Sequence, residues 1–367
     1  MWLKNLTLLH FKNCASAELC FSEGANAFVG NNGAGKTNLL DAIHYLCLCK
    51  SYFNPIDNQQ IKQGEELFLI QGDFERQAKA EKITCGLKKN QKKQFKRNKK
   101  EYAKLAQHIG LFPLVMISPY DINIIMEGSE ERRRFLDNVI SQTDAKYLDT
   151  LIAYNRCLLQ RNALLKQANT SFHLDLNLLE ILDAQLVGLG NQIYQKRKSF
   201  LTIFIELFQA YYKRISGQAE SVELSYSSPL NEADFDSLLQ ANLSKDRHLE
   251  RTSVGIHKDD LLFCIGGFPL KKFGSQGQQK SFLIALKLAQ YAFLDQQNGF
   301  KPILLLDDIF DKLDESRVQE LMEMVSAHDF GQIFITDTNA SRIAEIFQKI
   351  GTPIRLFEVQ KGEVQLA

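Results

Sequence analysis

One short segment near the amino terminus restricts the fold of this chain more than any other feature. The run Gly30-Asn-Asn-Gly-Ala-Gly-Lys-Thr37 matches G-x-x-x-x-G-K-[ST] at every position, and it lies between a strand-like and a helix-like stretch. Backbone N–H groups of such a loop surround phosphates, and the positive end of the following helix adds to the attraction. The segment therefore predicts a nucleotide site in an α/β fold. The predicted nucleotide-binding residues are Gly30, Asn31, Asn32, Gly33, Ala34, Gly35, Lys36, Thr37 and Asn38.

An acidic segment late in the chain complements this phosphate-binding loop, or P-loop. Residues 303–308, Ile-Leu-Leu-Leu-Asp-Asp, form an apolar run that ends in two carboxylates. Lys36 is expected to reach the β- and γ-phosphates, while Thr37 and Asp307 are expected to hold Mg²⁺. Asp308 is placed to orient or deprotonate the attacking water, so Lys36 and Asp308 are the predicted catalytic residues. Without a P-loop, the same acidic pattern is often only a strand end and a helix cap.

A third segment distinguishes between classes of P-loop protein. A helix is predicted to open at Ser275, Gln276, Gly277 and Gln278, upstream of the acidic strand, and this opening resembles the signature motif of ABC-type ATPases. In that class the signature of one subunit completes the ATP site of a facing subunit, which implies a homodimer. The alternative is that Ser275 only caps the helix. By the same resemblance Asp314 fits the D-loop, and Asp337 stands where that class often has its switch histidine.

Strand-like and helix-like patterns alternate at both ends of the chain. Strands are predicted before residue 30 and over 67–98, 114–117, 261–265, 303–307 and 332–336. Helices are predicted from Lys36 to about Cys49, from Gln276 to about Gln296, and near Glu315–His328. Strands that alternate with helices imply a mainly parallel sheet.

The middle of the chain has the pattern of two long helices. Residues 129–168 contain neither Pro nor Gly, and a second apolar stripe runs from Leu182 to Tyr211 after a polar break. This predicts an antiparallel helical hairpin with helices on the order of 60 Å long, and an ordinary helical bundle is an equal alternative. The predicted domains are a discontinuous head, residues 1–128 with 249–367, and an inserted arm, residues 129–248.

A net charge of +1 gives no overall argument for nucleic-acid binding, so such a surface has to come from local clustering. One cluster contains Lys88, Lys89, Lys92, Lys93, Lys96, Arg97, Lys99 and Lys100. Contact between this cluster and several DNA phosphates is one interpretation. The other is a solvated edge hairpin, whose lysines discourage pairing between sheets.

Cysteine usage and hydropathy bear on the compartment. The seven cysteines are scattered, and no pair has Cys-x-x-Cys spacing, which favours buried, reduced thiols. The amino terminus does not look like a signal peptide, and no apolar stretch reaches membrane-spanning length. The expectation is a cytoplasmic protein without a membrane partner.

Several further segments together resemble the RecF family, the recombination-repair branch of the ABC/SMC-like ATPases. They are Leu3–Asn13, Leu39–Ile43, Ser118–Asp121, Glu130–Asp137, Gln160–Lys166, Gly255–Leu261 and Leu305–Asp314. The middle and late segments are more specific than the P-loop, which many unrelated proteins share. The resemblance runs nearly end to end. It implies an ABC/SMC-like P-loop ATPase head of the α/β class, with a mixed sheet and an inserted α-helical arm, lobe II.

The resemblance also implies an activity, with ATP and Mg²⁺ as cofactors. It implies an ATP-dependent dimer that binds double-stranded DNA and recognises gaps or single/double-strand junctions in DNA repair and replication. RecR would be a partner, with RecO and RecA downstream, in RecA loading and SOS induction. Hydrolysis would be weak, stimulated by DNA, and would reset the dimer. None of this DNA specificity follows from composition or spacing.

Three other classes share part of the pattern. The nucleotide-binding subunit of a membrane transporter has the same motifs, but it needs a surface for coupling helices and lacks the RecF-like segments. A metabolic P-loop kinase needs neither the Ser275 motif nor a dimer. A non-hydrolysing scaffold would not need intact Lys36, Thr37, Asp307 and Asp308.

Overall fold

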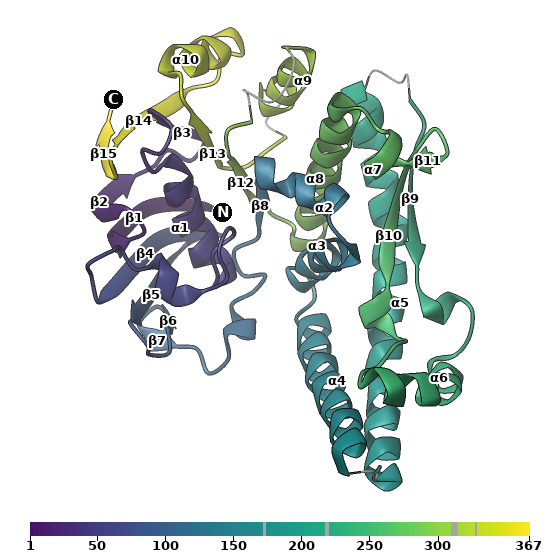
Figure 1. Cartoon of the computed structure of the whole chain (residues 1–367). Coiled ribbons are helices and arrows are strands. Elements are labelled where there is room, and N and C mark those ends of the chain that lie inside the picture. The colour runs from purple at the N-terminus through teal and green to yellow at the C-terminus, as the bar shows by residue number, and fades with distance from the viewer. Residues whose placement is uncertain (172–173, 217–219, 310–314, 327–328) are drawn as a thin grey trace. The chain divides into compact units, whose positions relative to one another are not determined.

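The computed structural model describes residues 1–171, 174–216, 220–309, 315–326 and 329–367. The chain forms two compact units, each with its own internal packing (Figure 1). Unit 1 comprises Met1–Asp121 and Lys280–Ala367, and unit 2 comprises Ile122–Gln279. None of the helices in the described part of the chain is long and apolar enough to cross a membrane.

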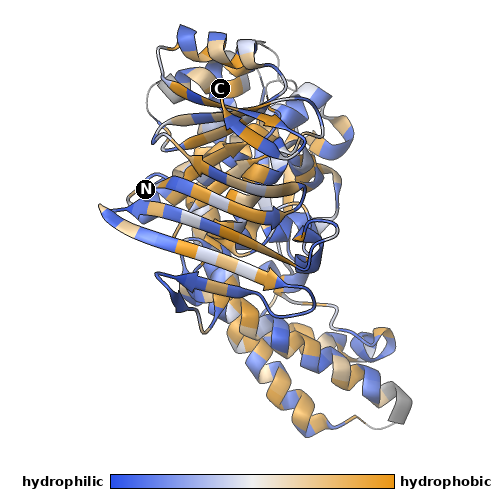
Figure 2. Cartoon of the chain, turned by 90° about the vertical axis from the view of Figure 1, so that its left-hand side faces the viewer, coloured by the Kyte–Doolittle hydropathy of each residue, from blue (hydrophilic) through white to orange (hydrophobic). Residues whose placement is uncertain are grey.

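The first sheet of unit 1 is antiparallel, with strand order β2-β1-β4-β5-β6-β7. Its strands are β1 (Trp2–Phe11), β2 (Cys14–Cys20), β4 (Leu67–Arg76), β5 (Lys79–Lys88), β6 (Gln94–Arg97) and β7 (Lys100–Glu101). Alternating residues of β5 are buried, from Glu81 through Ile83 and Cys85 to Leu87. This is the period expected of a sheet with one covered face. Figure 2 shows this alternation as hydrophilic and hydrophobic bands along the strands beside the N-terminus.

The second sheet of unit 1 is mainly parallel, with strand order β15-β14-β3-β13-β12-β8. Its strands are β3 (Ala25–Val29), β8 (Leu114–Ile117), β12 (Ile303–Leu306), β13 (Ile333–Asp337), β14 (Ile354–Gln360) and β15 (Glu363–Leu366). Only β15 runs antiparallel to its neighbour, so the predicted mixed sheet is confirmed. Because β13 lies between β3 and β12, the segments that follow these three strands meet at one edge of the sheet.

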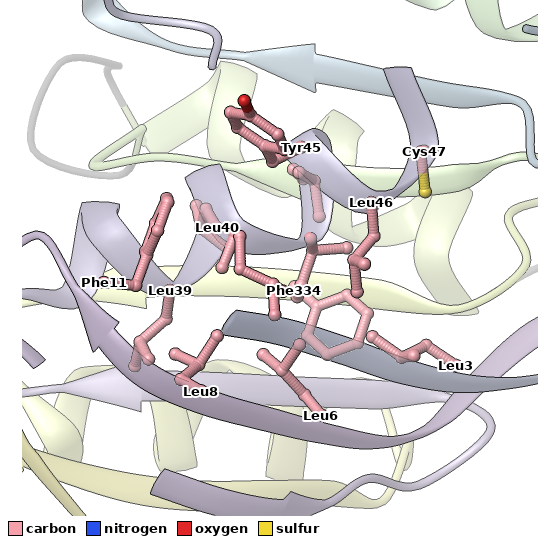
Figure 3. Close-up of a cluster of buried hydrophobic side chains, with 14 of the residues drawn as sticks. Leu3, Leu6, Leu8, Phe11, Leu39, Leu40, Tyr45, Leu46, Cys47 and Phe334 are labelled. Carbon is pink, nitrogen blue, oxygen red and sulfur yellow. The ribbon is translucent and has the colours of Figure 1, made fainter. Parts of the chain in front are cut away.

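Helix α1 (Lys36–Leu48) connects the cores of the two sheets. It contacts β1, β4 and β5 of the first sheet and β8 and β13 of the second. Figure 3 shows the cluster in which its side chains pack against β1 and Phe334 of β13. The labelled residues of this cluster are Leu3, Leu6, Leu8, Phe11, Leu39, Leu40, Tyr45, Leu46, Cys47 and Phe334. Each fully buried leucine contributes about 1.5–3 kcal/mol, so the helix after the P-loop is firmly held.

The described part of unit 1 also contains α-helices from the second half of the chain. They are α8 (Gln276–Asn298), whose first turn belongs to unit 2, α9 (Glu315–Ser326) and α10 (Ala340–Lys349). The buried face of α8 carries Lys287, whose Nζ lies 2.6 Å from Asp121 Oδ1. Both residues are nearly inaccessible, and each lies close in sequence to a point where the chain passes from one unit to the other.

Unit 2 contains the helices of the predicted arm and a small sheet, of which only the strand over residues 261–265 was predicted. Its helices are α2 (Asn123–Met126), α3 (Ser129–Ser141), α4 (Ala145–Ser171), α5 (Leu176–Ser216), α6 (Phe235–Leu249) and α7 (Leu270–Phe273). The sheet has the order β11-β10-β9, from β9 (Val222–Ser227), β10 (Asp260–Ile265) and β11 (Phe268–Pro269). α4 packs against α5, which favours the hairpin alternative, and α6 packs against both helices.

The first predicted arm helix is in fact two helices. The first helix, α3, ends at Ser141. Asp144 then caps α4 by accepting a hydrogen bond from Tyr147 N at 2.9 Å. α4 has 27 residues and α5 has 41, which gives lengths of about 40 and 62 Å. Only α5 has the expected length, because the capping carboxylate of Asp144 stops the periodic pattern.

The compact units and the predicted domains divide the chain at different places. Residues 249–279, which we assigned to the head, lie in unit 2 because β10 pairs along its whole length with β9. Residues 122–128 also belong to unit 2. All seven cysteines are free, as expected, but Cys20 is exposed and Cys264 is partly exposed.

Candidate nucleotide site

The P-loop connects β3 to α1, and its shape requires glycine at two positions. A Cβ at Gly30 would lie 2.2 Å from the carbonyl oxygen of Val359. A Cβ at Gly35, where φ is +116°, would lie 2.6 Å from the Asn13 side chain. At Gly30 the obstructing atom belongs to the backbone, so a larger residue would displace the loop. At Gly35 a larger residue would displace the Asn13 side chain and strain a backbone conformation that favours glycine. These glycines are therefore needed for packing of the loop as well as for access to phosphates.

Lys36 lies on the inner side of this loop. Its Nζ donates hydrogen bonds to the carbonyl oxygens of Gly30, at 2.7 Å, and Asn31, at 3.0 Å. The side chain is buried, while Asn31, Asn32 and Gly33 at the tip of the loop are exposed. Phosphate oxygens are stronger partners for an ammonium than carbonyl oxygens, so a nucleotide bound in the loop would compete for Lys36.

The two predicted magnesium ligands lie together, although they are far apart in sequence. Thr37 Oγ1 donates to Asp307 Oδ1 at 2.9 Å, and Thr336 Oγ1 donates to the same oxygen at 2.8 Å. Burial raises the pKa of the Asp307 carboxyl, and the hydrogen bonds from Thr336 and Thr37 partly offset this. A hydroxyl and a buried carboxylate beside the P-loop are the hard oxygen donors that Mg²⁺ prefers, so the residues fit the ion.

Asp308 and Asp337 stand at the same edge of the sheet. Asp308 has a left-handed backbone, with φ +49°, and its N–H donates to Thr336 Oγ1 at 2.9 Å. Asp337 accepts hydrogen bonds from Arg342 on both carboxylate oxygens at 2.7 Å, and its carbonyl accepts from Gly30 N at 3.2 Å. The carboxylate at the predicted switch position is therefore already paired with an arginine. Asp314, the predicted D-loop residue, lies outside the described residues.

Thr336 is a site residue that the sequence analysis missed. Its hydroxyl donates to the Asp307 carboxylate and accepts from the backbone N–H of Asp308, so one side chain holds both the predicted metal ligand and the backbone that carries the predicted base. The only sequence signal was a polar residue at the end of the apolar strand Ile333–Asp337. Thr336 would thus support the carboxylate that is expected to hold Mg²⁺.

A Thr336→Val variant is expected to require about 10–100-fold more Mg²⁺ for ATP binding, the usual effect of losing an outer-shell partner. Valine keeps the shape of the side chain, but it leaves Asp308 N without this acceptor. It also removes a hydrogen bond that stabilises the ionised carboxylate of Asp307. Magnesium titrations of ATP binding measure the change. Thr336→Ser keeps the hydroxyl and is expected to behave like the wild type. A valine variant with unchanged Mg²⁺ dependence would contradict this role.

Asn13 is a second residue that was missed. From the turn between β1 and β2, its Nδ2 donates to Ala34 O at 3.0 Å, and its Oδ1 accepts from Asn38 Nδ2 at 2.7 Å. Gly362 N donates to the same carbonyl of Ala34 at 2.8 Å. Asn38, which we predicted to bind nucleotide, therefore uses its side chain to fix the loop to the first sheet.

The predicted signature residues form a closed turn in unit 2. Ser275 Oγ accepts from Gln278 N at 3.2 Å, which is the geometry of a helix cap at the start of α8. Ser275 N donates to Gln278 Oε1 at 2.7 Å, so the two residues are joined twice. Ser275 and Gln276 are exposed. The structure thus supports the cap, and an exposed helix N-terminus also suits an anion.

The basic cluster lies at the edge strands of the first sheet, and two of its members have structural partners. Lys93 Nζ lies 2.9 Å from Asp57 Oδ2, and Arg97 Nε donates to Glu81 Oε2 at 2.8 Å. The other six side chains are exposed or partly exposed: Lys88, Lys89, Lys92, Lys96, Lys99 and Lys100. This position agrees with the edge-hairpin alternative, and it also leaves positive charge accessible to a polyanion.

Comparison with known proteins connects this arrangement to one family. The family model of the RecF/RecN/SMC N terminal domain matches residues 2–365. The DNA replication and repair protein RecF of Parabacteroides distasonis is 51% identical over 100% of this chain and 99% of its own length. That of Flavobacterium johnsoniae is 52% identical over 98% of this chain and 100% of its own length.

Solved structures agree with the sequence relatives. The recombination mediator protein RecF with ATP, in the RecFOR pathway, has a TM-score of 0.91 at 31% identity, covering 100% of this chain and 97% of its own. The Smc head domain of Pyrococcus furiosus has a TM-score of 0.60 at 16% identity, covering 100% of this chain and 96% of its own. The second match shows a shared fold only, which confirms the ABC/SMC-like architecture. The chain belongs to the RecF branch of the RecF/RecN/SMC family.

Proposed function

We propose that this chain is an ATPase of DNA repair and replication, whose ATP site is completed by a second copy of the chain. The observation that carries the proposal is the contact between Thr37 of the P-loop and Asp307 at the end of β12. It unites two segments of an ATP site in a chain that is 31% identical to a RecF solved with ATP.

Different residues of unit 1 have different roles at the bound nucleotide. The N–H groups of the Gly30–Lys36 loop and the Lys36 ammonium bind the phosphates. Thr37 and Asp307 would hold Mg²⁺, which would supply positive charge to neutralise the phosphates. Asp308, held by Thr336, orients the attacking water and accepts its proton. Hydrolysis is slow, because ATP here controls a conformational state.

The second copy supplies the signature turn, which we define as Ser275–Gln278. Its exposed helix N-terminus offers the Ser275 hydroxyl and backbone N–H groups to the γ-phosphate bound by the other subunit. Binding of ATP thus favours the dimer, and hydrolysis with release of phosphate favours separation. Asp314 would lie in the D-loop of this interface, and Asp337 would act as the switch residue while paired with Arg342.

The closed dimer binds double-stranded DNA and recognises gaps or single/double-strand junctions, and it assists RecR and RecO in RecA loading and SOS induction. The RecFOR pathway of the solved relative supports RecO and RecR as partners. The six accessible lysines of residues 88–100 are the proposed DNA contacts in unit 1. They would make binding fall steeply with salt, because each neutralised phosphate releases counterions.

Sizing chromatography with light scattering, with and without ATP, tests the proposal on the wild type and on Ser275→Arg. The wild type is expected to be monomeric alone and dimeric with ATP, and to bind DNA only as the dimer. Ser275→Arg is expected to stay monomeric, because its bulk and position obstruct contact with the other subunit's γ-phosphate. A wild type that stays monomeric with ATP and ignores DNA would contradict the proposal.

A further inference from the structure

We infer that Glu220 is a positioning residue that fixes the signature turn in the orientation needed for ATP-dependent dimerisation. The inference rests on the proposed function and assigns to it a residue outside every motif. Glu220 Oε1 accepts a hydrogen bond from Gln278 Nε2 at 2.8 Å, and its Oε2 accepts from the Tyr212 hydroxyl at 2.5 Å. Both oxygens of this carboxylate are thus used, one on the signature turn and one on α5.

The contact with Glu220 determines how the Gln278 amide points. Gln278 Oε1 already accepts from Ser275 N at 2.7 Å, so the amide NH₂ must face away from Ser275. Glu220 accepts a hydrogen bond from that NH₂ group, and Gln278 N in turn donates to Ser275 Oγ. The acceptor on Glu220 therefore helps to hold the Ser275 hydroxyl, the group proposed to meet the γ-phosphate.

Glu220 itself is held by more than one element of unit 2. Ser221 O accepts from Gly266 N at 2.8 Å, and Val222 pairs with Ile265 where β9 joins β10. Tyr212 is buried near the end of α5. Glu220 consequently links a helix and a sheet to the first turn of α8. A carboxylate is also favourable beside the N-terminal turn of a helix.

This arrangement keeps Gln278 in one orientation before a second copy arrives. A free glutamine side chain would have to be ordered on association, and that loss of freedom would weaken the dimer. Glu220→Ala is therefore expected to weaken ATP-dependent dimerisation about tenfold, through the lost hydrogen bond and the added disorder. Binding of ATP to the monomer is expected to stay unchanged, because the P-loop belongs to unit 1.

A Glu220→Gln variant distinguishes the contribution of the Glu220 hydrogen bonds from that of its negative charge. A glutamine at this position can accept from Gln278 through its oxygen and donate its NH₂ to the Tyr212 oxygen, so both contacts survive. It is expected to dimerise as the wild type does. Glu223→Ala, at an exposed position on the neighbouring strand β9, is the matched control and is also expected to match the wild type.

The experiment measures the dimerisation constant by sedimentation with ATP and Mg²⁺, and the ATP affinity of the monomer, for all four proteins. The inference is supported if Glu220→Ala is the only one of the four proteins that dimerises weakly and if its ATP affinity is unchanged. Wild-type dimerisation by Glu220→Ala overturns it, and so does a Glu220→Gln variant as weak as Glu220→Ala. If the wild type itself does not dimerise, the proposed function fails and the inference fails with it.

Discussion

A Lys36→Met variant is expected to bind ATP at least about 100-fold more weakly than the wild type and to remain monomeric with ATP. Lys36 Nζ lies inside the P-loop at 2.7 Å from Gly30 O, where the phosphates of a nucleotide would meet it. Two charge-assisted hydrogen bonds of about 1.5–3 kcal/mol each correspond to this loss. Methionine has a similar length and no charge, so the loop keeps its packing.

Calorimetry or a fluorescent ATP analogue measures the loss directly. Lys349→Met, on the exposed last turn of α10, is the control and is expected to bind ATP normally. A Lys36→Met protein that still dimerises with ATP would contradict the assignment of the nucleotide site. Unchanged thermal unfolding without ATP would show that the variant is folded.

Asp308→Asn is expected to bind ATP, to dimerise and then to hydrolyse ATP at least about 100-fold more slowly, since a general base contributes roughly 10²–10⁴-fold. Asparagine cannot accept the proton from water. It does tolerate the left-handed backbone at this position, where φ is +49°, and its N–H still reaches Thr336. The variant therefore removes the base and keeps the local geometry.

Single-turnover hydrolysis and sizing chromatography separate the two effects. The dimer formed by Asp308→Asn with ATP is expected to persist far longer than that of the wild type. Asp149→Asn, at an exposed position on α4, should hydrolyse ATP at the wild-type rate. Rapid turnover by Asp308→Asn would exclude Asp308 as the base.

The parts of the site that were predictable are those that a continuous segment determines. The strand, loop and helix around Gly30–Thr37 follow one another in the chain, so the local pattern is sufficient. The apolar strand before Asp307 was recognisable in the same way. Their meeting could be expected from the known pairing of these motifs, and the contact between Thr37 and Asp307 agrees with it.

The missed residues act through contacts that only the fold brings together. Asn13 and Ala34 belong to different strand connections, and Thr336 meets Asp307 only because β13 lies beside β12. Glu220 reaches Gln278 across 58 positions of sequence. Local patterns carry no information about such register and packing, so no spacing rule would have identified these residues.

The errors in the fold have equally specific causes. The break between α3 and α4 was visible as a capping residue, Asp144, within a run that otherwise had helical spacing. The strand β10 was predicted, but its partner β9 belongs to the helical unit, and strand pairing over a long separation is not encoded locally. The pairing of Asp337 with Arg342 likewise needed the start of α10, which the sequence analysis did not predict.

The most direct test of the shared ATP site is to mix two inactive variants, Lys36→Met and Ser275→Arg. Each alone is expected to stay monomeric with ATP and to hydrolyse none. In the mixture, the intact P-loop of Ser275→Arg and the intact signature turn of Lys36→Met can form one complete site. The account predicts a mixed dimer with ATPase activity, detected by sizing with one protein tagged. A mixture that remains monomeric and inactive, while the wild type dimerises under the same conditions, would contradict it.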